Sequence, residues 1–144
     1  MISGRGDIDP TQPAVAEALV LTTDPGAARL RGRMPAGASV ESMGNEVSVP
    51  AAVQLVRGQG HRSILCEGGP SIIGQLLGSR LLDELFLTIS PVLAGRPGDE
   101  RRPGLVEGVR LLPDDGVWAS LTSVRRHRSH LLLRYDLRSG GGGR

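Results

Sequence analysis

A Gly-Gly-Pro sequence at residues 68–70 stands where an apolar run typical of a strand gives way to a helical pattern. Glycine lets the backbone turn sharply and approach a ligand, and proline is favoured at the first position of a helix. The N–H groups of Ser71, Ile72 and Ile73 would then be free at a helix N-terminus, where the helix dipole favours an anion. This corner predicts a phosphate site, and a tight turn without a ligand is the open alternative.

The corner matches none of the common glycine-rich or nucleophile motifs. It lacks the Gly-Lys-Ser/Thr ending of a P-loop and the G-x-G-x-x-G fingerprint of dinucleotide-binding folds. Ser71 is followed by two isoleucines instead of the x-Gly of a nucleophile elbow, and no His or Asp stands where it would activate the hydroxyl. We therefore expect Ser71 to cap the helix or to bind a phosphate, and Gly74 to allow close packing of the helix against a sheet or ligand.

Glu67 comes directly before the corner, at the end of a run that we interpret as a buried strand. A carboxylate in such a place needs a partner or a ligand to offset its desolvation. It would bind hydroxyl or amino groups of a substrate, and an ion pair with an Arg is the alternative. Cys66 points to the other face of the strand and is assigned to the core.

The histidines, His61, His127 and His130, have no metal-ligand spacing with one another or with Cys66, so we predict no metal site. A single cysteine excludes an intrachain disulfide and is compatible with a reducing compartment. No apolar run approaches the ~20 residues that span a bilayer. We predict a cytoplasmic location.

The elements that must position the corner follow from apolar spacing. Asp24, Pro25 and Gly26 predict a turn after the first of the strands. Alternating strands and helices in the first half favour a parallel sheet, and the second half favours antiparallel strands. The predicted fold class is α/β: a mixed, largely parallel sheet flanked by helices, with a C-terminal antiparallel hairpin. Strands are predicted at 17–23, 38–43, 62–69, 83–95, 117–126 and 129–138, and helices at 49–60 and 71–82.

Several segments outside these elements have a composition of their own. The run at 83–95 is so continuously apolar that we expect both faces of its strand to be covered. Residues 96–104 form a charged loop, and the cluster from Arg125 to Arg128 stands at the hairpin tip, where a solvated turn is favoured over a phosphate-binding patch. We expect residues 139–144 to be a flexible Gly-rich tail.

Composition narrows the class of protein. The chain has 144 residues, of which 39% are hydrophobic, enough to form the core of one domain. The net charge of +2 and the three aromatic residues argue against a nucleic-acid-binding module, which needs a basic surface and stacking side chains.

The stretch from residue 64 to residue 96 resembles the reductase domain of bifunctional riboflavin-biosynthesis enzymes, the RibD C-terminal type, which has a dihydrofolate-reductase-like fold. The similarity includes Glu-Gly-Gly-Pro at 67–70, Leu-Asp-Glu-Leu at 82–85 and a strand ending in Pro91 and Gly95. Order and spacing over this stretch make the resemblance more specific than any one of its parts.

The resemblance implies an NADPH-dependent reductase that converts a ribosylamino-pyrimidine 5′-phosphate to its ribityl form. It implies that Glu67 faces the substrate, and that the Ser-Gly-Arg segment at 3–5 lies near the adenosine side of the cofactor. It names no catalytic acid or base. The implied cofactor-binding residues are Gly68, Gly69, Pro70, Ser71, Ile72, Ile73, Gly74 and Gln75.

The family also carries a Ser-x-Asp-Gly segment and a Gly-x-x-Thr cofactor turn, and neither is present here. We therefore expect residues 1–138 to correspond to the C-terminal portion of a reductase domain. Exposed sheet edges would then favour association, and the resemblance implies a homodimer formed through 83–95. The alternative hypothesis is a catalytically incomplete half-domain that acts as a nucleotide-binding or assembly module. A nucleic-acid module that uses 125–128 is the least favoured.

Overall fold

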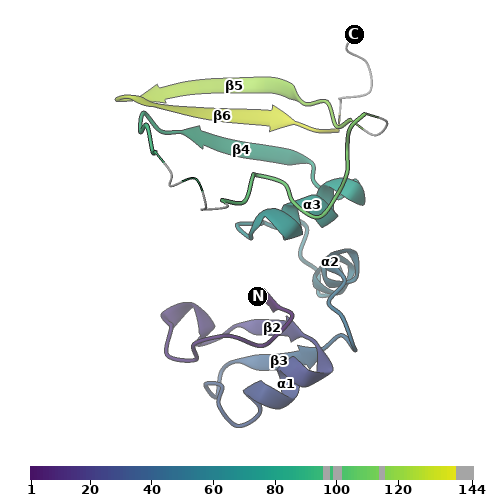
Figure 1. The fold of residues 1–144 in the computed structure, drawn as a ribbon. Helices are drawn as coiled ribbons and strands as arrows, with labels where there is room; N and C mark the ends of the chain where they lie inside the picture. Colours follow the sequence, from purple (N-terminus) through teal and green to yellow (C-terminus); the bar gives the residue numbers. More distant parts are fainter. Residues whose placement is uncertain (96–97, 99–101, 114–115, 139–144) are drawn as a thin grey trace. The chain divides into compact units, whose positions relative to one another are not determined.

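The computed structural model describes residues 1–95, 98, 102–113 and 116–138. The chain divides into two compact units, Met1–Ile64 and Leu65–Arg144, each with its own three-stranded sheet (Figure 1). The predicted α/β class is therefore confirmed, with one parallel and one antiparallel sheet. The predicted tail at 139–144 and part of the predicted loop at 96–104 lie outside the described residues.

The first unit is built on a parallel sheet in the order β1-β2-β3. Its strands are β1 (Ile2–Ser3), β2 (Leu19–Thr22) and β3 (Ser39–Ser42), which confirms the strands predicted at 17–23 and 38–43. A short 3-10 helix, η1 (Pro13–Val15), precedes β2. Helix α2 (Val49–Gly58) was also predicted, and Ser48 caps it by accepting a hydrogen bond from the Ala51 N–H. The core of this unit consists of Val15, Val20, Leu21, Leu30, Val49 and Ala52.

Helix α1 (Asp24–Leu30) stands where the sequence predicts a turn, so that prediction was wrong. Pro25 lies in the first turn of the helix, where a missing N–H costs nothing. Thr23 is the N-cap and its hydroxyl accepts a hydrogen bond from the Gly26 N–H at 3.2 Å. Asp-Pro-Gly is thus the start of a helix here, because a threonine cap precedes it.

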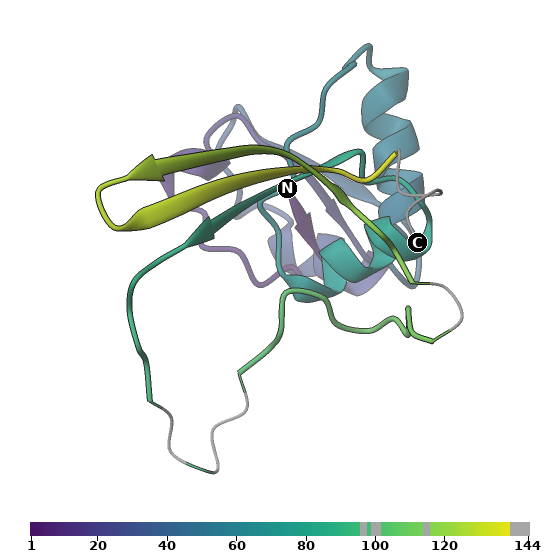
Figure 2. The same cartoon turned by 90° about the horizontal axis from the view of Figure 1, so that it is seen from above.

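The second unit contains helix α3 (Pro70–Gly78) and an antiparallel sheet in the order β4-β6-β5. Strand β4 spans Glu84–Ile89, β5 spans Ser120–His127 and β6 spans His130–Asp136. The predicted hairpin is confirmed, since His127 pairs with His130 across its turn. Figure 2 shows these three strands side by side.

Residues 61–69 form neither strand nor helix, so the strand predicted at 62–69 was wrong. An apolar run becomes a strand only when another strand pairs with its backbone, and that partner is not determined by local sequence. Most of these side chains are exposed, including Leu65. The expectation of a buried strand ahead of the corner therefore does not hold in this structure.

The expectation that both faces of the 83–95 strand are covered was also wrong. Phe86 and Ile89 of β4 are 64% and 48% exposed. Strand β4 is at the edge of its sheet. On one of its faces, the Arg134 guanidinium lies 5.4 Å from the centre of the Phe86 ring and pairs with Glu84. Among the described residues, no helix has the length and apolar character needed to cross a membrane.

Candidate functional site

Gly69 is the N-cap of α3, and Pro70 begins the helix, as the corner sequence predicts. No side chain in the described part of the chain caps this N-terminus. A Cβ atom at Gly69 would meet nothing within 4 Å, so the space beside the cap is open. The corner thus has the conformation expected of an anion site, with an accessible backbone at a helix start.

Fewer N–H groups are free at this helix start than the sequence suggested. The Ile72 N–H and the Ile73 N–H both donate to the Gly69 carbonyl oxygen, at 3.0 and 3.2 Å. The prediction of three free donors was therefore wrong, because the first turn closes tightly on its cap. Among the described residues the Ser71 N–H has no backbone acceptor, and with the exposed Ser71 hydroxyl it is the donor pair that the corner offers.

A loop from the connection between β4 and β5 crosses α3, which sequence reasoning did not foresee. The Glu107 N–H donates to the Pro70 carbonyl oxygen at 3.1 Å. A Cβ atom at Gly74 would lie 2.1 Å from the Glu107 carbonyl oxygen and 3.2 Å from Val109. Gly74 is indeed a close-packing position, but its neighbour is this loop instead of a sheet or ligand.

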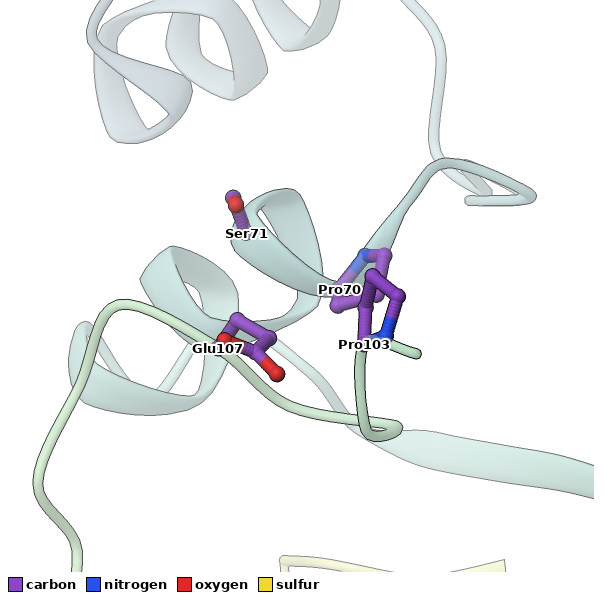
Figure 3. Close-up of a pocket in the computed structure, with 4 residues that line it drawn as sticks. All are labelled: Pro70, Ser71, Pro103 and Glu107. Atoms are coloured by element: carbon purple, nitrogen blue, oxygen red, sulfur yellow. The ribbon is translucent and has the colours of Figure 1, made fainter. Parts of the chain in front are cut away.

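The loop and the helix start together form an open depression of about 340 Å³, lined by Pro70, Ser71, Pro103 and Glu107. Figure 3 shows Pro70 and Ser71 on the first turn of α3, and Pro103 and Glu107 on the crossing loop. Its volume is at the lower end of the ~300–1,000 Å³ range of small-molecule sites. The Ser71 N–H and hydroxyl are the donors on one side of the depression, and the Glu107 carboxylate lies on the other.

Glu67 is exposed in the structure, and it does not stand on a strand. The desolvation argument for a ligand at this carboxylate therefore fails, and its role toward substrate stays a prediction from the family resemblance. Cys66 is half-buried, which agrees with a packing role more than with an exposed reactive thiol.

A second group of polar residues gathers at the carboxyl end of the parallel sheet, where open α/β sheets bind ligands. The Thr22 hydroxyl donates to the Ser3 carbonyl oxygen at 2.5 Å, and the Thr23 hydroxyl donates to that of Gly4 at 2.7 Å. Ser42 donates to Asp24. Only the Ser-Gly-Arg segment at 3–5 was noticed in the sequence; the threonines look like ordinary strand residues until the register is known.

These hydroxyl groups are directed at the protein itself. They hold the segment after β1 against the start of α1, and a Cβ atom at Gly6 would lie 2.6 Å from the Gly26 carbonyl oxygen. Arg5 and Arg29 both pair with Asp7, at 3.3 and 2.7 Å, and all three side chains are largely exposed. The backbone at this edge is therefore held together by hydrogen bonds, and both of its arginines are paired with Asp7.

No group of three or more His, Cys, Asp and Glu side chains in the described part of the chain is arranged to hold a metal ion.

Comparison with known proteins decides the family. The model of the RibD C-terminal domain matches residues 3–124, which include both the corner and the crossing loop. The chain belongs to the RibD C-terminal domain family. The resemblance noted in the Glu-Gly-Gly-Pro region is thereby confirmed over most of the chain.

Two known proteins are similar to this RibD C-terminal chain. A Debaryomyces hansenii protein, named 2,5-diamino-6-ribosylamino-4(3H)-pyrimidinone 5′-phosphate reductase, is 38% identical over 73 residues, which are 49% of this chain and 28% of that protein. A solved pyrimidine reductase-like protein from Corynebacterium diphtheriae superposes with a TM-score of 0.71 at 21% identity, covering 94% of this chain and 59% of that one. The second likeness shows a shared fold. The chain spans less than two thirds of the length of either relative.

Proposed function

We propose that this RibD C-terminal chain is the C-terminal portion of a reductase of riboflavin biosynthesis. The reductase uses NADPH to reduce a ribosylamino-pyrimidine 5′-phosphate. Family membership across residues 3–124 is the observation that carries the proposal. The name of the yeast relative supports the substrate class, and the phosphate-fitting depression at α3 supports a nucleotide cofactor.

In this proposal the residues from Gly68 to Gln75 hold the cofactor phosphates, and Ser71 contributes its N–H and hydroxyl. Glu67 faces the substrate. The cofactor supplies the hydride, so the protein's task is to bind and orient two ligands. Gly74 acts indirectly, because it lies beneath the Glu107 loop and lets that loop approach the helix.

A homodimer and a cytoplasmic location belong to the same proposal. The exposed Phe86 and Ile89 on edge strand β4 support association through the 83–95 region. The single cysteine, Cys66, supports a reducing compartment.

The first test is a calorimetric titration of the chain with NADPH, with Gly69→Asp as the site variant. The new carboxylate would occupy the open space at the helix start and repel a phosphate, so we expect affinity to fall by at least about tenfold. Gly58→Asp is the matched control, since Gly58 is also exposed with nothing within 4 Å of its added Cβ.

Equal binding by the wild type and Gly69→Asp would show that the corner is not the cofactor site. Absence of NADPH binding in all three proteins would contradict the cofactor assignment and favour the assembly-module alternative. If only Gly69→Asp loses binding, NADPH oxidation in the presence of the phosphorylated pyrimidine is the assay that follows.

A further inference from the structure

The two edges of the antiparallel sheet differ in how they are protected against pairing with a further strand (Figure 1). Strand β5 has a register irregularity between Leu121 and Ser123, and Arg125 and Arg126 stand near its end. Bulges and charged side chains are the usual protection of an exposed edge. Strand β4 has an uninterrupted register, no basic residue, and apolar residues on both of its faces. The edge at β4 is therefore the one that is open to another strand.

The register identifies the backbone groups that β4 directs to this open edge. The Leu137 N–H donates to the Asp83 carbonyl oxygen at 2.9 Å, so Asp83 and every second residue after it pair with β6. The residues between them, Glu84, Phe86 and Thr88, direct their N–H and C=O groups away from β6. Outside the sheet, no group in the described part of the chain accepts a hydrogen bond from the Phe86 or the Thr88 N–H.

We propose that β4 pairs antiparallel with β4 of a second copy of this chain, about a two-fold axis at Leu87. Leu87 then lies opposite Leu87 of the second copy, and Leu85 lies opposite Ile89. On the other face, Phe86 lies opposite Thr88. Aliphatic pairs, and pairs of an aromatic with a β-branched residue, stabilise antiparallel strands.

The charges on the two edges favour a second copy at β4. Self-pairing of β5 near its turn would bring Arg125 and Arg126 close to the same residues of the other copy, and like charges across strands are destabilising. The single charged residue of β4 is Glu84, which already pairs with Arg134 at 2.6 Å. In the proposed pairing it lies opposite Ser90 of the second copy, so no like charges meet.

The same reasoning selects the register. An axis at Phe86 would place Asp83 opposite Ile89 of the second copy, which sets a carboxylate against an aliphatic side chain. An axis at Leu87 places no charged residue opposite an apolar one. The inference rests on the homodimer of the proposed function and gives it an edge and a register. It uses the backbone of β4, so packing between the apolar faces of two sheets is a separate contact.

Disulfide formation between two copies tests the register. In a Cys66→Ser background, Leu87→Cys puts one cysteine on the two-fold axis, where Cα atoms of a non-hydrogen-bonded pair lie about 4.5 Å apart, within reach of a disulfide. Phe86→Cys is the matched control: Phe86 is 64% exposed and Leu87 is half-buried, so random collisions would favour position 86. We expect Leu87→Cys to cross-link at least about fivefold faster under mild oxidation.

Amide hydrogen exchange tests the edge itself. We expect the Phe86 and Thr88 amides to exchange at least about tenfold more slowly as the protein concentration is raised. The Arg126 amide is the internal control, because His127 pairs with His130 at the turn and the alternation then directs the Arg126 N–H outward from β5.

Proline variants remove one outward N–H from each edge, a change that edge strands tolerate. Thr88→Pro should abolish the concentration-dependent protection of Phe86, and Arg126→Pro should leave it unchanged. Thermal unfolding of each variant shows whether the fold is intact.

Three outcomes would overturn the inference. Cross-linking of Leu87→Cys that is no faster than that of Phe86→Cys would exclude the register. Self-association with unprotected Phe86 and Thr88 amides would exclude pairing at this edge and leave the proposed homodimer in place, whereas protection that does not depend on protein concentration would exclude a second copy as the occupant. A chain that stays monomeric at all concentrations would overturn both the edge pairing and the homodimer, and the NADPH titration tests the reductase proposal separately.

Discussion

The absence of a side chain at Gly74 lets the Glu107 loop pack against α3. The Glu107 carbonyl oxygen lies where a Cβ atom at Gly74 would be, at 2.1 Å, and backbone cannot move aside as a side-chain tip can. The loop that brings Glu107 to the corner therefore depends on a glycine in the middle of α3. That glycine has a cost in helix propensity which the loop contact must offset.

We expect Gly74→Ala to destabilise the protein by about 1–3 kcal/mol, because the added methyl group forces the loop away from the helix. Chemical denaturation measures this change. The same variant should weaken NADPH binding, since the depression between the loop and the first turn of α3 would lose its shape.

Gly58→Ala is the matched control for that prediction. Gly58 ends α2 and has no atom within 4 Å of its added Cβ. Replacement there should leave stability unchanged or raise it by about 0.5–1 kcal/mol through helix propensity. If Gly74→Ala changed the free energy of unfolding as Gly58→Ala does, the loop contact would not contribute to stability.

The residue scale also shows where sequence reasoning stops. Gly68, Gly69 and Pro70 could be assigned to a corner because glycine permits a sharp turn and proline favours the first position of a helix. Glu107 could not be assigned, since its role depends on a loop that returns to α3 from more than 30 residues away. Glu67 was given a buried setting that depended on a strand partner, and the structure leaves it exposed.

At the scale of elements, the sequence predicted the helices and strands that depend on local interactions. Helix α2, helix α3, strands β2 and β3, and the β5–β6 hairpin were all predicted from apolar spacing, caps and turn residues. Helix α1 was missed because Asp24, Pro25 and Gly26 are typical of a turn, whereas in the structure Thr23 caps a helix that begins there. The strand at 62–69 was wrong because pairing is not a local property.

The end of α3 is a further element-scale feature, and it leads to a prediction about Arg80. The Leu81 N–H donates to the Leu76 carbonyl oxygen and the Arg80 N–H to that of Leu77, which is the Schellman pattern. Arg80 therefore has a φ of 54°, where glycine is preferred. We expect Arg80→Gly to stabilise the protein by about 0.5–1 kcal/mol.

Thermal or denaturant unfolding tests Arg80→Gly against Arg110→Gly, which replaces an exposed arginine outside any element and without positive φ. A loss of stability in both variants would mean that the positive φ at Arg80 carries no penalty worth relieving.

At the scale of the whole molecule, one face of the antiparallel sheet is more apolar than the other. Leu87 pairs with Leu133, which pairs with Val124, so all three side chains share the apolar face. Val124 on this face is 54% exposed, and Ile89 and Leu121 are 48% and 53% exposed. Exposed apolar surface of this kind marks an interaction site.

We expect the chain to self-associate through this sheet, and Val124→Arg to shift the equilibrium toward monomer by introducing charge on the apolar face. Sedimentation equilibrium measures the change. Asn45→Arg, at an exposed position in the first unit, is the control that should leave association unchanged. A monomeric wild type, or equal effects of both variants, would contradict a dimer formed through the apolar face.

The crossing of α3 by the Glu107 loop has one more consequence, for local opening of the fold. The loop is tied to the helix by the Glu107 N–H and by Val109 over Gly74 and Gly78, so the two segments should open as one cooperative unit. A ligand at the depression touches both segments and lowers the population of the open state for each. Ligand binding at the corner should therefore slow the exchange of the Val109 amide with solvent, although Val109 lies outside the depression.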